Sequence, residues 1–375
     1  MASSAQNQQH DHQLPNSYRG ATSAPPPTPS ALPTNLLSTS DAADALSRIL
    51  HRLPPTLSIP TRRSPPTTCP PIISFPDRTS PAFLDELFSS SSQLGFFQLT
   101  DHSIPPELAN SAESEALSIF NLPRDRKESY FPKNWPLGYD GDADDEGGDR
   151  IGESLCLDDS CSAESTVLSL ASLREFTRAM EKVGLEVIES LSNSVGFENP
   201  LGKDPTHFCS LMWICEGVPG SKLVMPGGFY PFVVGLQYQV RIQKYSLLAD
   251  SGWVSVSPQV DSVMVTIGDV LQVWSNGKLK KVRGRPVVGC LGEGKNISMT
   301  VLVTLPMDSR VYPILSKTIG GDGEIDHSDG RTDHVGGDDD DDDQVFNSFS
   351  FEDYAWRVSQ ECPLLKDPLQ RYRIH

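Results

Sequence analysis

The sequence predicts an α+β protein in which helices come first and a β-sandwich or barrel follows. The first observation is an apolar stripe at steps of three or four residues, which is typical of a helix packed along one face. Its members are Leu173, Phe176, Met180, Val183, Val187 and Leu191. The second is a series of short β-branched runs after residue 229, separated by turn signals such as Ser251-Gly252. Many short strands at such spacing are typical of a sandwich or barrel.

The single elements can be placed in chain order. Ser80 before Pro81 predicts a helix start, a second helix is expected over residues 106–120, and Gly196 is a natural end for the helix with the apolar stripe. Asn276-Gly277 predicts a hairpin between two strands. A further helix is expected over residues 351–358. The expected strands are residues 70–75, 95–99, 229–245, 253–256, 262–267, 270–274, 280–282 and 299–305.

Composition divides the chain into five segments. They are a Ser/Pro-rich leader at 1–65 that we expect to be disordered, a helical region at 66–200, a strand-rich core at 201–310, an acidic Gly/Asp-rich insertion at 311–345, and a helix with a tail at 346–375. In the leader, residues 42–53 have helical apolar spacing. The run Asp338 to Asp343 is expected to be a solvated loop, because like charges repel and a calcium site needs spaced ligands and a turn glycine.

The net charge and the distribution of cysteines limit which binding partners and which cellular compartment we expect. The 375 residues carry a net charge of -18, which argues against binding nucleic acid or an anionic membrane surface. The seven cysteines are scattered and form no C-x-x-C pair, a pattern typical of reduced thiols inside the cell. The N-terminus lacks a hydrophobic signal region and no apolar stretch approaches membrane-spanning length. We expect a cytoplasmic or nuclear protein, and a plastid transit peptide stays open because the leader is rich in Ser and Thr.

Several motifs then occur in one order along the chain. They are Pro71-Ile72-Ile73-Ser74-Phe75, Leu94-Gly95-Phe96-Phe97-Gln98-Leu99 followed by His102, Phe120-Asn121-Leu122-Pro123, Gly252-Trp253-Val254-Ser255-Val256, Ile267-Gly268-Asp269-Val270-Leu271-Gln272-Val273 and Ser275-Asn276-Gly277-Lys278. In this order they resemble the plant 2-oxoglutarate- and iron(II)-dependent dioxygenases, including gibberellin oxidases. The resemblance covers about residues 70–375. It implies a double-stranded β-helix (jelly roll) with N-terminal helices and a C-terminal helix.

The resemblance also implies where iron and 2-oxoglutarate should bind. The family holds Fe(II) with two histidines and one carboxylate, and grips 2-oxoglutarate with an arginine two residues before a serine. On that pattern, the first histidine and the carboxylate fall at Gly228 and Tyr230, and the distal histidine falls at Gly284. The arginine falls at Asn296, whereas Ser298 keeps the serine. All metal-ligand positions are therefore vacant, and we expect no metal ligand, no catalytic residue and no bound Fe(II) or 2-oxoglutarate.

Few other residues could take over the binding of the metal or of 2-oxoglutarate. Arg283 and Arg285 flank Gly284 and are candidates for residual contacts with an anionic ligand, although solvated arginines at a strand edge are the favoured interpretation. Asp269 is favoured as a turn or capping residue. The family's upstream tyrosine aligns only loosely with residues 213–216. The histidines that follow the leader are His102 in a turn, His207 before a strand, His327 and His334 in the acidic insertion, and His375.

These observations leave three hypotheses for function. The leading hypothesis is a dioxygenase homologue that has lost catalysis and serves as a binding or regulatory protein for a small molecule or a protein. The alternative is an active 2-oxoglutarate-dependent oxidoreductase of a small, gibberellin-like plant metabolite, with a divergent metal site. The third is a structural interaction module with a fully packed barrel. Fold analogy by itself cannot choose among them.

Overall fold

The computed structural model describes residues 67–75, 80–141, 152–158, 170–202, 205–217, 227–289, 296–315, 344–361 and 366–374. The chain divides into two units, Met1–Arg63 and Ser64–His375, and the described residues all belong to the second. The predicted leader, its helix at residues 42–53 and the run Asp338 to Asp343 lie outside the described residues. The segment boundaries drawn from composition therefore stay predictions.

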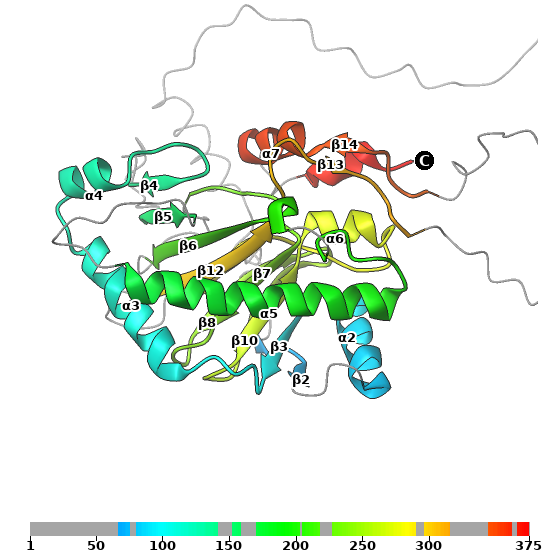
Figure 1. Cartoon of the computed structure of the whole chain (residues 1–375), viewed down its shortest axis with the longest axis horizontal. Helices are drawn as coiled ribbons and strands as arrows, with labels where there is room; N and C mark the ends of the chain where they lie inside the picture. Colours follow the sequence, from blue (N-terminus) through cyan, green and yellow to red (C-terminus); the bar gives the residue numbers. More distant parts are fainter. Residues whose placement is uncertain are drawn as a thin grey trace, which may run out of the picture. The chain divides into compact units, whose positions relative to one another are not determined.

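Two β-sheets form the centre of the second unit (Figure 1). The larger sheet has the spatial order β2 (Ile72–Ser74), β3 (Phe96–Thr100), β10 (Val263–Ile267), β7 (Val234–Tyr238), β12 (Asn296–Thr304), β6 (Cys209–Gly217), β5 (Ser154–Leu157) and β4 (Gly138–Asp140). The smaller sheet has the order β1 (Thr67–Thr68), β9 (Gly252–Val256), β8 (Lys244–Ala249) and β11 (Val282–Gly289). One buried apolar cluster joins side chains of both sheets, namely Phe96, Tyr245, Leu247, Val256, Met264 and Val282. The predicted α+β jelly roll is confirmed.

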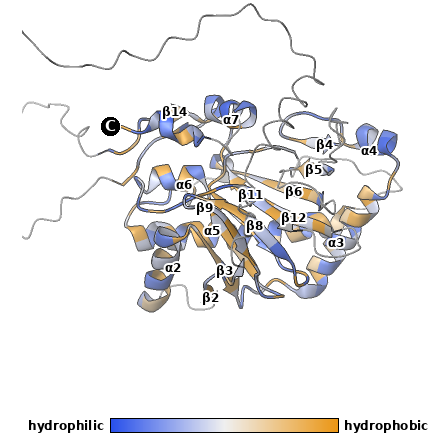
Figure 2. Cartoon of the chain, turned by 180° about the vertical axis from the view of Figure 1, so that it is seen from behind, coloured by the Kyte–Doolittle hydropathy of each residue, from blue (hydrophilic) through white to orange (hydrophobic). Residues whose placement is uncertain are grey.

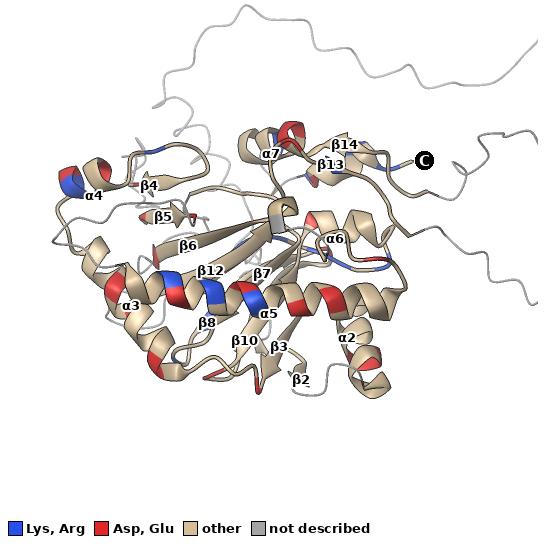
Figure 3. Ribbon diagram, in the orientation of Figure 1, with Lys and Arg blue, Asp and Glu red and all other residues tan. Residues whose placement is uncertain are grey.

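Helices flank the larger sheet. The first helices are α2 (Pro81–Gln93), α3 (Pro106–Phe120), α4 (Arg124–Tyr130) and the long α5 (Ala171–Val195). In Figure 2 the strands are mostly apolar, whereas α4 is mostly hydrophilic. Figure 3 shows the charged positions of α5 along the side that faces the viewer, away from the sheet behind it. Among the described residues, no helix has the length and apolarity needed to cross a membrane.

Helix α5 fixes the position of the larger sheet. Its predicted stripe is buried, and the helix ends at Gly196 in the left-handed conformation that the sequence predicted (φ +92°). At Gly184 the helix comes so close to the sheet that an added Cβ would lie 2.9 Å from both Leu236 and Val303. At the N-terminus of α5, the Glu115 carboxylate accepts the backbone N–H groups of Ser172 and Leu173 at 3.2 and 2.9 Å. The carboxylate satisfies donors that the first helical turn leaves open.

Four of the predicted β elements differ from the structure. Within the expected strand at 229–245, only β7 (Val234–Tyr238) and the start of β8 at Lys244 are strand, because the chain bends between them, and of the expected strand at 280–282 only Val282 is strand, at the start of β11. The expected strand at residues 270–274 is the short helix α6 (Asp269–Trp274), whose six residues are all buried. A run buried on every side shows no periodicity, so a short helix and a core strand cannot be told apart by pattern. Asn276 and Gly277 do form a turn with positive φ angles of 49° and 81°, but the turn follows α6 instead of joining two strands.

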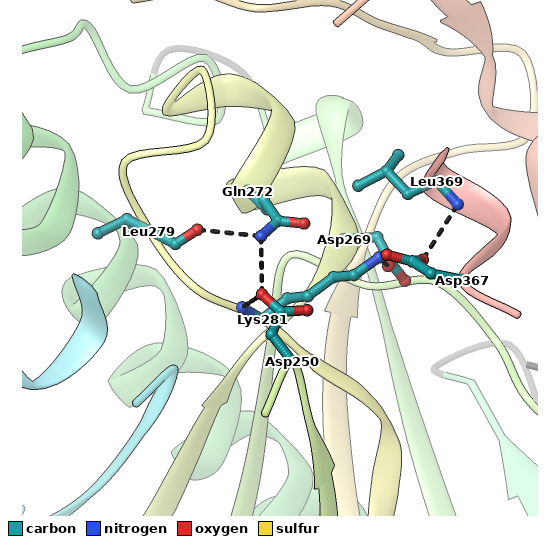
Figure 4. Close-up of polar contacts among 7 residues, drawn as sticks. All are labelled: Asp250, Asp269, Gln272, Leu279, Lys281, Asp367 and Leu369. Carbon is teal, nitrogen blue, oxygen red and sulfur yellow. Dashed lines mark hydrogen bonds and ion pairs between the residues drawn. The ribbon is translucent and has the colours of Figure 1, made fainter. Parts of the chain in front are cut away.

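The C-terminal segment packs back onto the barrel. It comprises β13 (Arg310–Val311), β14 (Phe349–Ser350), α7 (Phe351–Gln360) and the 3-10 turn η2 (Pro368–Tyr372). The predicted helix over residues 351–358 is confirmed by α7. Lys281, which is completely buried, joins this segment to the barrel, because its Nζ donates to Asp269 at 2.6 Å and to Asp367 at 2.7 Å (Figure 4). Asp367 also accepts the Leu369 backbone N–H at 3.1 Å and so caps η2.

Candidate functional site

Tyr230 lies in the stretch that leads into β7, at the position that the family pattern assigns to the iron-binding carboxylate. It is 4% exposed, and other aromatic rings surround it. Its ring centroid lies 5.6 Å from that of Trp135, 6.3 Å from that of Trp213 and 6.2 Å from that of Phe351. Burial raises the pKa of the Tyr230 hydroxyl above its ordinary value, so the phenol is neutral at pH 7. The position therefore holds an uncharged ring of the core.

The two histidine positions are glycines with left-handed backbone. Gly228 has a φ of +72° and is exposed, and Gly284 has a φ of +70° and is buried. Gly284 lies where the pairing of β11 with β8 shifts register, between Arg283 and Val287. Left-handed backbone costs an L side chain roughly 1–2 kcal/mol. Neither position offers a donor, and a histidine at either one would be strained in this backbone.

The prediction for Arg285 is wrong. A solvated arginine at a strand edge was favoured, but Arg285 is 3% exposed and points into the barrel. Its guanidinium carbon lies 3.6 Å from the centroid of the Trp213 ring, which is a stacked cation–π contact. The register shift between Arg283 and Val287 explains the error, because such a shift re-aims the side chains within it and the sequence gives no sign of one. Arg283 itself is half-buried.

The serine of the predicted 2-oxoglutarate clamp lies in the same interior. In the larger sheet, Ser298 of β12 is paired with Cys215 of β6. The Cys215 thiol makes side-chain hydrogen bonds with Ser298 and with Arg285, and burial raises its pKa. Asn296 lies two residues before Ser298 on β12, where its backbone pairs with Gly217. The buried guanidinium near Ser298 is therefore that of Arg285 on β11. The family pattern places this arginine on β12, at the position of Asn296.

Trp213 contacts both Tyr230 and Arg285. In the sequence it lies in the segment 213–216, which aligns only loosely with the family's upstream tyrosine. Its indole contacts the rings of Tyr230 and the guanidinium of Arg285, and a Cβ added to Gly227 would lie 2.8 Å from its Nε1. We call Trp135, Trp213, Tyr230, Phe351 and Trp356 the aromatic cluster. The cluster reaches the surface at the exposed Trp356 of α7, whose ring stacks on that of Trp135 with 4.4 Å between centroids. No single motif could have predicted it, because its members come from four separate segments.

The histidines that the structure describes have other roles. The Nδ1 atom of His102 accepts the Ile104 backbone N–H at 3.1 Å, and its Nε2–H donates to the Asp261 carbonyl at 3.0 Å. Burial lowers the pKa of His102, so the ring is a neutral turn-forming group, as predicted. His207 is exposed in η1 (Pro205–His207), directly before β6. His327, His334 and His375 lie outside the described residues.

The carboxylates of Asp269 and Asp250 also have other partners. Asp269 begins α6 and pairs with Lys281, and Asp250 accepts the Gln272 side-chain amide at 3.2 Å (Figure 4). Within the described ranges, no group of three His, Cys, Asp or Glu side chains could hold a metal ion. Four cysteines in these ranges, Cys69, Cys156, Cys209 and Cys215, are free thiols. The set Gly228, Tyr230 and Gly284 supplies neither imidazole nor carboxylate, so Fe(II) does not fit it.

Comparison with known proteins gives two matches in chain order. Residues 70–162 match the N-terminal region of the non-haem dioxygenase in morphine synthesis, and residues 229–304 match the 2OG-Fe(II) oxygenase superfamily. In these two regions the chain is similar to the 2OG-Fe(II) oxygenase superfamily. Members of this superfamily use Fe(II) and 2-oxoglutarate. The resemblance seen in the motifs is confirmed at this level.

Individual members of the superfamily are similar to the chain over most of their length. Protein DMR6-LIKE OXYGENASE 1 of Arabidopsis thaliana is 27% identical over 246 residues, which cover 61% of this chain and 70% of that protein. Gibberellin 2-beta-dioxygenase 1 of Pisum sativum is 26% identical over 257 residues, which cover 61% and 76%. The crystal structure of JOX2 in complex with 2OG, Fe and JA superposes with a TM-score of 0.62 at 16% identity, covering 83% of this chain and 91% of that one. The structural likeness shows that the fold is shared.

Proposed function

We propose that the chain is a non-catalytic member of the 2OG-Fe(II) oxygenase superfamily that serves as a binding or regulatory protein. The observation that carries the proposal is the environment of Tyr230. At the position assigned to the iron-binding carboxylate, a neutral phenol is held by Trp135, Trp213 and Phe351. A phenol with a raised pKa is a poor iron ligand, and the ring is packed as part of the core.

The other assigned positions support the same proposal. Gly228 and Gly284 have no side-chain donor, and their left-handed backbone disfavours a histidine. The clamp arginine is replaced by Asn296, while Arg285 stacks on Trp213 beside Ser298. Loss of one ligand leaves a weaker site, but here all three metal-ligand positions and the clamp arginine differ at once, and only Ser298 is kept. Without Fe(II), the reaction of this superfamily has no place to occur.

The competing function is an active oxidoreductase with a divergent metal site. It needs three ligands on one face of an octahedron, with open positions for 2-oxoglutarate and dioxygen. In the part of the chain that the structure describes, no such group of side chains occurs. A metal titration decides between the two functions without assuming which residues take part.

The test uses the full chain under anaerobic conditions. Thermal unfolding is measured with Fe(II), with 2-oxoglutarate and with both, and succinate formation is then measured in air. A ligand at a hundred times its Kd stabilises the folded state by about 2.7 kcal/mol, which shifts the Tm by several degrees. We expect no joint shift and no succinate. The gibberellin 2-beta-dioxygenase 1 of Pisum sativum, assayed in parallel, controls for the quality of the Fe(II) and 2-oxoglutarate. A joint shift or succinate above the protein-free background contradicts the proposal.

A further inference from the structure

A cavity of about 480 Å³ opens beside Tyr230, on the side of the larger sheet where β6 begins and β12 ends. This volume lies in the usual range of sites for small organic molecules, roughly 300–1,000 Å³. Most of its wall is apolar and includes Leu137, Leu211, Leu305 and Met307. Tyr230 belongs to this wall as well as to the aromatic cluster, so the cavity borders the vacant iron position without lying in it.

The polar part of the wall is acidic. Glu181 from the middle of α5 and Asp158 after β5 both line the cavity, and the described residues of the wall include no lysine, arginine or histidine. The Glu181 carboxylate is half-buried and makes no hydrogen bond or ion pair within the described ranges. A carboxylate at the wall of a mostly apolar cavity favours a cation, because apolar neighbours solvate its negative charge less well than water does.

Two hydroxyl groups belong to residues of the wall. The Ser210 Oγ is shielded from solvent and has no hydrogen-bond partner among the described residues. Thr304 also lines the cavity, but its hydroxyl donates to the Pro231 carbonyl at 3.0 Å. Buried hydroxyl groups without partners are uncommon in native proteins. Because the Ser210 Oγ is shielded, it does not reach a molecule in the cavity, and recognition rests on the Glu181 carboxylate and the apolar wall.

We propose that this cavity binds a small, largely apolar molecule that carries a protonated amine. The ammonium group pairs with Glu181, and the apolar body packs against Leu211, Leu305 and Met307. The inference rests on the binding role proposed above and names the class of ligand for it. Because Tyr230 is in ring contact with Trp213 and Trp135, a bound molecule also changes the surroundings of these indoles.

The test compares three probes that share one apolar body and differ in charge. They are 3-phenylpropan-1-amine, 3-phenylpropan-1-ol and 3-phenylpropanoate, titrated into the full chain by calorimetry with indole fluorescence as a second readout. We expect the amine to bind about tenfold or more tightly than the alcohol, the ratio for one charge-assisted hydrogen bond. The carboxylate should bind most weakly, since it meets Glu181 with like charge.

Variants locate the site. Glu181→Gln should make the amine and the alcohol equal in affinity, whereas Glu175→Gln, an equal charge change at an exposed position of α5, should keep the preference. Met307→Trp, which fills the cavity from a half-buried position, should weaken binding of all three probes. Circular dichroism checks that each variant is folded.

Three results overturn the inference: no probe binds, the probes bind equally, or the preference survives in Glu181→Gln. The metal titration separates this failure from that of the non-catalytic proposal. If the probes fail and Fe(II) with 2-oxoglutarate also gives no shift, the ligand class is wrong and the non-catalytic proposal stands. If Fe(II) and 2-oxoglutarate bind and the amine preference is found, the cavity is real and the non-catalytic proposal is wrong.

Discussion

Replacement of Lys281 by methionine tests how the C-terminal segment is held. Its ammonium group is fully buried and lies 2.6 Å from an Asp269 oxygen and 2.7 Å from an Asp367 oxygen. Methionine keeps most of the volume and removes the charge, so Lys281→Met leaves two buried carboxylates facing each other. Both side chains are only 8% exposed, so water cannot replace the lost partner.

The size of the effect can be worked from this geometry. The two oxygens share one Nζ, so they are at most about 5.3 Å apart, and at an effective dielectric constant of 20 their repulsion is about 3 kcal/mol. Removal of one partner from buried ion pairs costs about 3–5 kcal/mol in measured cases, which agrees with this value. We therefore expect the free energy of unfolding to fall by about 3–5 kcal/mol, and the Tm by about 5–8 °C for a unit of this size.

Urea unfolding followed by indole fluorescence measures the loss. Lys280→Met is the matched control, because Lys280 is the exposed neighbour and its change should stay within about 0.5 kcal/mol. The triple variant Lys281→Met, Asp269→Asn, Asp367→Asn should recover much of the stability, since it removes the repulsion as well as the cation. If Lys281→Met costs no more than Lys280→Met, the ion-pair argument is refuted.

Two further changes follow from contacts in the core. Gly184→Ala forces a Cβ to within 2.9 Å of Leu236 and Val303, and calorimetric unfolding should show a loss of about 1–3 kcal/mol that is absent in Gly202→Ala, where the nearest heavy atom is 3.6 Å away. Burial lowers the pKa of His102 from 6.5, so the folded state binds fewer protons and its stability falls as the pH drops below about 6.5. Unfolding free energies measured from pH 7.5 to 5 should fall less steeply in His102→Gln than in the parent or in His207→Gln, and equal slopes would count against this account.

The sequence predicted the elements whose pattern is local. The stripe of α5 and its end at Gly196 depend on residues three or four apart, so a single helix encodes them. Short β-branched runs between turn signals also predicted β2, β3, β9, β10 and β12, because such runs are likewise local. The pattern failed at α6, where all six residues are buried and the difference between helix and strand depends on tertiary packing.

The candidate site was predictable only in part. The sequence supplied the positions Gly228, Tyr230 and Gly284, and the structure places Tyr230 and Arg285 together on Trp213. The burial of Arg285 was missed because it depends on a register shift in β11. The aromatic cluster and the acidic cavity were missed because their members come from strands, helices and loops far apart in the sequence, and only the fold brings them together.

The pairing of Lys281 with Asp367 also sets an order of events during synthesis. The two residues are 86 positions apart, and Asp269 precedes Lys281 by 12. At about 5–20 residues per second, a ribosome adds those 86 residues in roughly 4–17 s. Strand β12, the last strand of the two sheets, ends at Thr304, so in the later part of that interval every strand of both sheets has been made. One carboxylate partner of the buried Lys281 ammonium has then not yet been made. During translation there is therefore a period in which all strands of the jelly roll have been synthesised but the Lys281 ammonium still lacks its Asp367 partner.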